Sequence, residues 1–67
     1  MNDRISRFVI STWVEKKQDY KVLETFDTKL AARIEYYAKI GKGEYSSLFL
    51  IDAEKGKIIS RWVRKDK

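Results

Sequence analysis

The stretch FDTKLAARIEYYAKIGKG, residues 26–43, decides how this chain folds, because within it the spacing of apolar residues changes from two to the helical period. At its start, Asp27 or Thr28 offers a side-chain oxygen to the first free backbone N–H groups of a helix. At its end, Gly41-Lys42-Gly43 supplies the left-handed conformation that terminates a helix. The pattern therefore predicts one amphipathic helix over residues 28–41.

Two sets of residues on this helix are expected to face in different directions. The stripe expected to face the core consists of Leu30, Ala31, Ile34, Tyr37 and Ala38. The edge expected to lie away from the core consists of Lys29, Arg33, Tyr36 and Ile40.

Segments rich in β-branched and aromatic residues lie on both sides of the helix. Two precede it, at residues 5–14 and 20–26, and two follow it, at residues 45–51 and 57–63. Such segments predict strands. Between the last two, the turn sequence DAEKG places Asp where a turn starts and Gly where a positive φ is needed, which indicates a hairpin.

These elements predict an α+β fold with two layers in the order β-β-α-β-β. It is a four-stranded, mainly antiparallel sheet with one helix packed on one face. No repeat, proline or linker divides the sequence, so residues 1–67 are expected to form a single domain. Residues 64–67 are expected to form a flexible basic tail.

The composition restricts the chemistry of the chain. It has 67 residues and contains neither Cys nor His, which excludes disulfides and the usual nucleophile–base pairs and zinc sites. We therefore expect no catalysis, no metal and no cofactor, and no feature indicates a small-molecule substrate. Oligomerisation is the remaining common way to stabilise so small a core. The lack of Cys favours a cytoplasmic protein, and no apolar segment is long enough for a signal peptide or a membrane span.

The net charge is +5, and the excess lies in the helix region and near the C-terminus. This bias favours contact with nucleic acid or an acidic protein. A solubilising surface explains the same charge equally well.

A single helix can cover only one side of the sheet. Alternation along the strands can place both Trp13 and Trp62 on the uncovered side, where a large apolar patch would indicate an interface. A competing interpretation is that the tryptophans complete the core at the sheet edges. The candidate binding residues are Arg7, Trp13, Arg61, Trp62, Arg64 and Lys65.

The sequence thus predicts a small non-catalytic binding module. The first hypothesis is that an aromatic and basic sheet face binds nucleic acid or another polyanion, with bases stacked on the indoles. The alternative is a protein–protein interaction module. Under that hypothesis the chain is a homodimer or a small regulator or inhibitor of a partner protein, of the kind that phages encode.

Overall fold

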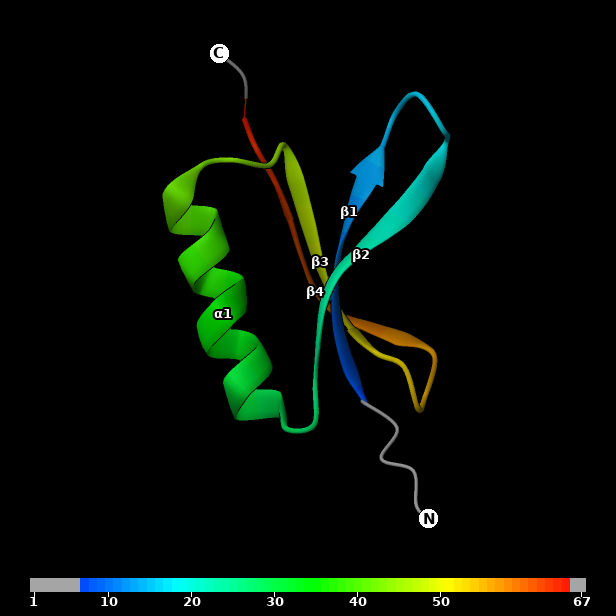
Figure 1. Ribbon diagram of the computed structural model, residues 1–67, viewed down its shortest axis with the longest axis vertical. Helices are drawn as coiled ribbons and strands as arrows, with labels where there is room; N and C mark the ends of the chain where they lie inside the picture. Colours follow the sequence, from blue (N-terminus) through cyan, green and yellow to red (C-terminus); the bar gives the residue numbers. More distant parts are fainter. Residues whose placement is uncertain (1–6, 66–67) are drawn as a thin grey trace.

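Four strands and one helix follow one another in the predicted order in the computed structural model, which describes residues 7–65 (Figure 1). Their bounds are β1 Phe8–Val14, β2 Asp19–Phe26, α1 Lys29–Lys42, β3 Ser47–Asp52 and β4 Lys57–Val63. The prediction of a two-layer α+β fold is confirmed. Residues 5 and 6 of the first predicted strand, and residues 66–67 of the predicted tail, lie outside the described residues.

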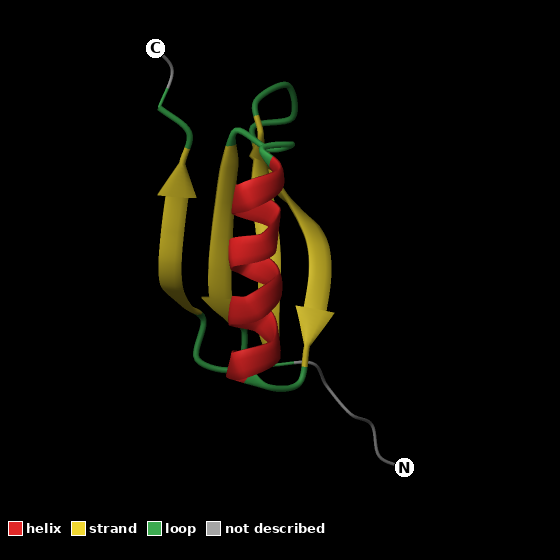
Figure 2. Ribbon diagram, turned by 90° about the vertical axis from the view of Figure 1, so that its left-hand side faces the viewer, coloured by secondary structure: helices red, strands yellow, loops and turns green. Residues whose placement is uncertain are grey.

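The strands form one antiparallel sheet in the order β2-β1-β3-β4, so β1 and β3 are central and β2 and β4 are the edges. Helix α1 lies across one side of this sheet, as Figure 2 shows with the helix in front. The opposite side of the sheet carries no second layer within the described chain (Figure 1). This arrangement leaves one face of the sheet uncovered, as the topology predicts.

Both ends of α1 have the capping residues that the sequence indicates. The Thr28 hydroxyl accepts a hydrogen bond from the N–H of Ala31 at 3.3 Å. At the other end Gly43 adopts φ 68°, and its N–H donates to the carbonyl of Ile40 at 3.2 Å. Because a side chain disfavours this left-handed conformation, the glycine ends the helix.

Two glycines at this end of the helix should respond to alanine in opposite directions. Gly43→Ala places a Cβ on a left-handed residue and should lower the free energy of unfolding by about 1 kcal/mol. Gly41 is helical, and a Cβ there would meet nothing within 4 Å, so Gly41→Ala should raise that free energy by up to ~1 kcal/mol. Urea unfolding of the two variants measures both changes. A stabilising Gly43→Ala would contradict this account of the helix end.

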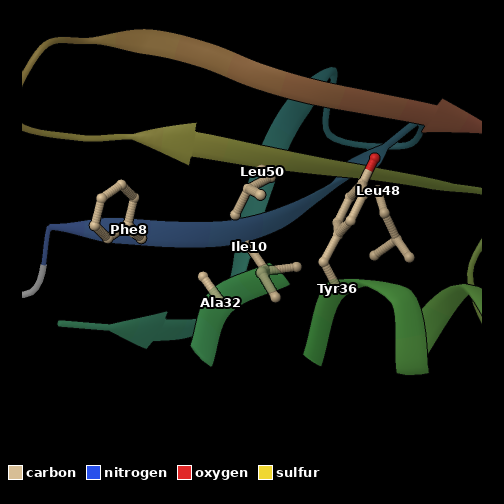
Figure 3. Packing of buried hydrophobic residues seen from close by; sticks show 6 residues of the cluster. All are labelled: Phe8, Ile10, Ala32, Tyr36, Leu48 and Leu50. Carbon is tan, nitrogen blue, oxygen red and sulfur yellow. The ribbon is translucent and has the colours of Figure 1, made fainter. Parts of the chain in front are cut away.

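The core lies between the helix and the sheet (Figure 3). Its buried members are Phe8, Ile10, Ala32, Tyr36, Leu48 and Leu50. The largest of them, Tyr36, is 1% exposed, and its hydroxyl accepts a hydrogen bond from Ser60 of β4 at 3.2 Å. A buried tyrosine needs such a partner for its hydroxyl. The core is therefore small and depends on one large ring from the helix.

The predicted core stripe of the helix was wrong. All five of its residues are exposed, while Ala32 and Tyr36, on the other side of α1, are buried. The small Ala32 allows a close approach to the sheet, and Tyr36 finds a partner for its hydroxyl there. Lys39 adds ion pairs on the same side, to Glu24 of β2 at 3.1 Å and Glu35 at 3.3 Å. The spacing of apolar residues gives no information about these polar contacts. They favour packing of the less hydrophobic side of α1 against the sheet.

Candidate functional site: the open sheet face

The side of the sheet away from α1, called here the open sheet face, is defined by the strand register. Residues directly opposite on neighbouring strands share a face, so Phe49 places Ser11 and Arg61 on its own side. The apolar members of the open sheet face are Val9, Trp13, Tyr20, Val22, Phe49, Ile51, Ile58 and Val63. Arg61 adds a positive charge on the edge strand β4.

Three aromatic rings from three strands contact one another on this face. The ring centroids of Trp13 and Tyr20 lie 5.1 Å apart with planes at 76°, and those of Tyr20 and Phe49 lie 5.1 Å apart at 86°. Edge-to-face pairs of this kind contribute about 0.5–1.5 kcal/mol each beyond area burial. Phe49 is only 8% exposed although no helix covers it. The rings are thus ordered by their own contacts.

The apolar side chains around the rings are accessible. Tyr20, Val22, Ile58 and Val63 are exposed, and Trp13 is half-buried. An antiparallel sheet with one side toward solvent usually carries polar residues on that side. Here both edge strands of that side carry exposed apolar residues instead, which indicates a binding surface. The uncovered face therefore has the character of an interface.

The prediction that both tryptophans share this face was wrong. Trp62 lies opposite Leu48 in the β3–β4 register and packs against the core on the helix side. The register shifts near Ile59, so Ile58 lies opposite Ile51 on the open sheet face while Trp62 keeps to the other side. Alternation alone does not say which set of residues faces the helix, and a bulge interrupts it.

The predicted basic residues are dispersed as well. Arg61 lies on the open sheet face, while Lys65 is exposed beyond the end of β4. The guanidinium of Arg64 donates to the carbonyl of Gly43, and its backbone N–H donates to Ser46 at 2.8 Å. Arg64 is thus anchored to the loop after α1, and its guanidinium is committed to a contact within the chain.

Arg7 is held by two carboxylates at the start of β1. Its guanidinium lies 3.3 Å from Asp52 and 3.1 Å from Glu54. Asp52 also accepts hydrogen bonds from the N–H groups of Glu54 and Lys55, at 3.1 and 3.2 Å. The hydrogen bond from Arg7 is the main reason that the pKa of Asp52 is lowered, and the same contact raises the pKa of Arg7. Asp52 therefore fixes both Arg7 and the β3–β4 turn.

Replacing this carboxylate should make stability depend less on pH. Asp52→Asn keeps an oxygen for the turn N–H groups but loses the charge paired with Arg7. Because the pKa of Asp52 is lower in the folded state, its charge stabilises the fold above the unfolded pKa of about 4, and the benefit disappears as pH falls through the folded pKa. Melting curves should show a lower Tm for Asp52→Asn at neutral pH and convergence with the wild type in acid. A constant difference across pH would contradict the ion-pair account.

For the third strand the sequence left two alternatives open, that Phe49 or that Leu48 and Leu50 face the uncovered side, and the register selects Phe49. Sequence reasoning missed Tyr20, and cross-strand pairing of Tyr20 with Trp13 was the signal that could have found it. It also missed a second exposed apolar surface. Leu30, Ile34 and Tyr37 form an outward stripe on the helix.

Comparison with protein-family models, with curated proteins and with solved structures finds no match to this chain. Within residues 7–65, no helix is long and apolar enough to span a membrane. The same residues contain no cluster of three side chains suited to hold a metal ion.

Proposed function

We propose that this protein is a non-catalytic association module whose open sheet face binds the same face of a second copy. One observation carries the proposal. One side of the four-stranded sheet carries eight apolar side chains, four of them exposed, and its aromatic rings are already ordered by mutual contact. A preorganised surface loses little side-chain entropy on binding, so its apolar area is available to drive association.

An apolar partner suits this face better than a polyanion does. A phosphate backbone is bound by several cations acting together. The strand register places one cation, Arg61, among the apolar residues of the open sheet face. The other predicted cations lie elsewhere, and Trp62 is on the helix side. Nucleic-acid binding by this face remains a prediction that no cluster of cations on the face supports.

The size of the domain argues for a second copy as the occupant. A chain of 67 residues buries only about 60% of the surface that it exposes when unfolded. With no Cys or His in the sequence, the chain has neither a disulfide nor a standard zinc site to compensate. Pairing two copies would enclose the aromatic rings in a second core between the sheets. The dimer would then have four layers, with a helix on each outer side.

The dimensions of the sheet fit such a pair. Four strands about 4.8 Å apart and seven residues long give a face of roughly 19 by 23 Å. The projected area of this face is about 440 Å², and its accessible surface is larger because side chains protrude from it. This approaches the ~600 Å² that each partner buries at the lower end of specific interfaces. Two such sheets pack about 10 Å apart with strands inclined by ~30°. Because β4 is an edge strand, Arg61 would lie at the rim, where its charge stays hydrated.

Sedimentation equilibrium over micromolar to millimolar concentrations tests the proposal. The expected result is a mass that rises with concentration toward about 16 kDa, twice the 8.0 kDa of the chain. High salt should not weaken the dimer, because apolar burial is not screened. A chain that sediments as a monomer throughout this range would overturn the proposal. Dissociation by salt would instead indicate an electrostatic contact.

A further inference from the structure

A cleft of about 340 Å³ lies where three segments of the chain meet. The helix start and the β3–β4 turn, which both contribute to it, lie at the same end of the domain (Figure 1). The start of β1 contributes Arg7 and Phe8, the first turn of α1 contributes Lys29, and the β3–β4 hairpin contributes the rest of the lining. The volume falls within the range of small-molecule sites, about 300–1,000 Å³.

Positive charge dominates this cleft. Its cationic lining residues are Arg7, Lys29, Lys55 and Lys57, and its one acidic lining residue is Asp52. Even with Glu54 counted because it pairs with Arg7, four positive charges face two negative ones, a net charge of +2. Both carboxylates are engaged by Arg7. The three lysines have no ion pair among the described residues, so their charge is available to a ligand.

Lys29 occupies a position where its charge works against the helix. It is the first residue of α1, beside the positive end of the helix dipole, and the first turn contains no acidic residue. A cation there is repelled by the helix dipole. An anion bound in the cleft would reverse this repulsion, because it would interact favourably with Lys29 and the helix end together. The unfavourable local charge thus becomes useful when a ligand is present.

Part of the cleft lining is apolar. It comprises the buried Phe8, Ile59, which packs against the core, and Ile58, whose side chain belongs to the open sheet face. Apolar groups beside the lysines lower the local dielectric, which strengthens the attraction of the lysines for an anion. Ile59 also offers a surface to a ligand that has an apolar body attached to its charged group.

We propose that this cleft binds the phosphate group of a nucleotide, with the phosphate between Lys29, Lys55 and Lys57 and the base against Ile59. The nucleotide is either free or part of a nucleic-acid strand, since the recognised phosphate is the same. The site is separate from the aromatic rings of the open sheet face. It does not depend on the homodimer.

Amide chemical shifts followed during titration test this proposal with three probes: inorganic pyrophosphate, ATP and a short single-stranded oligothymidylate. Saturable shifts are expected at Phe8, Lys29, Lys55 and Lys57 with at least one probe. Tighter binding of ATP than of the other probes would assign a free nucleotide, and tighter binding of the strand would assign nucleic acid. Equal affinity for all three would mean that the base contributes nothing and would overturn the assignment of a nucleotide.

A matched pair of charge-removing variants provides the control. Lys55→Gln/Lys57→Gln should weaken binding by about tenfold or more, because two of the cations lining the cleft are lost. Lys16→Gln/Lys17→Gln removes the same charge from the exposed β1–β2 turn and should leave binding unchanged. Equal loss in both pairs, or no localised shift with any probe, would overturn the proposal. Sedimentation of the same variants should be unaffected, which separates this test from that of the dimer.

Discussion

Tyr36→Ala is expected to lower the free energy of unfolding by about 3–5 kcal/mol. Removal of a fully buried aromatic side chain costs about 3–5 kcal/mol, and Tyr36 is the largest fully buried residue of the core. A domain of this size has a total stability of roughly 3–10 kcal/mol, at about 0.05–0.15 kcal/mol per residue. Loss of the ring therefore removes a large part of the stability. Urea unfolding followed by circular dichroism measures the change.

The neighbouring tyrosine gives a matched control for this result. Tyr37 is 55% exposed on the outer side of α1, and its ring touches that of Tyr36 edge to face, so Tyr37→Ala should lower the free energy of unfolding by about 0.5–1.5 kcal/mol, well below the effect of Tyr36→Ala. Tyr36→Phe keeps the ring and loses the hydrogen bond from Ser60, which should cost about 1 kcal/mol. If Tyr37→Ala proves more damaging than Tyr36→Ala, the helix packs through the stripe that its apolar spacing predicts, and the core described here is wrong.

Val22→Lys is expected to shift the dimer toward the monomer. Val22 lies on the open sheet face opposite Ser11 and is 58% exposed in the single chain, so the lysine can be accommodated there without loss of the fold. In a symmetric dimer the substitution introduces a charge into the interface twice. Because β2 is an edge strand, the added lysines can stay hydrated at the rim, but the apolar burial of a valine is lost on both copies, so the Kd should rise by about tenfold or more. Sedimentation at a concentration where the wild type is dimeric measures the effect.

Ile34→Lys is the control for this substitution. Ile34 is a β-branched residue with 62% exposure, on the outward stripe of the helix. The same change of size and charge on that side of the molecule should leave the dimer intact. Dissociation by Ile34→Lys, with Val22→Lys still dimeric, would move the interface to the helix and contradict the proposed function.

The order and type of the elements could be predicted because local signals agree along the chain. Thr28 and Gly43 cap α1 as their residue types indicate, and residues 57–63 form β4 as predicted. The direction of each face was harder to predict. Alternation along a strand divides its residues into two sets but does not say which set faces the helix. Trp62 can be assigned to a side only when the residue opposite it on the neighbouring strand is known.

The orientation of the helix could not be predicted from hydrophobicity, because its two sides are both partly apolar. Tyr36 and Tyr37 differ in burial although they are adjacent residues of the same type. Adjacent residues of a helix point about 100° apart, so only one of them can face the sheet, and Tyr36 finds a partner for its hydroxyl there in Ser60, which lies 24 residues away in the sequence. The cationic cleft could not be predicted either, because Arg7, Lys29 and Lys57 are far apart in the sequence and come together only through the fold.

Intermolecular nuclear Overhauser effects in a mixture of isotope-labelled and unlabelled chains test the central claim most directly. If two copies pair through their open sheet faces, cross-peaks between chains should involve the rings of Trp13 and Tyr20 and the methyl groups of Val22. Cross-peaks confined to Leu30, Ile34 and Tyr37, or none at a concentration where the chain is dimeric, would contradict it.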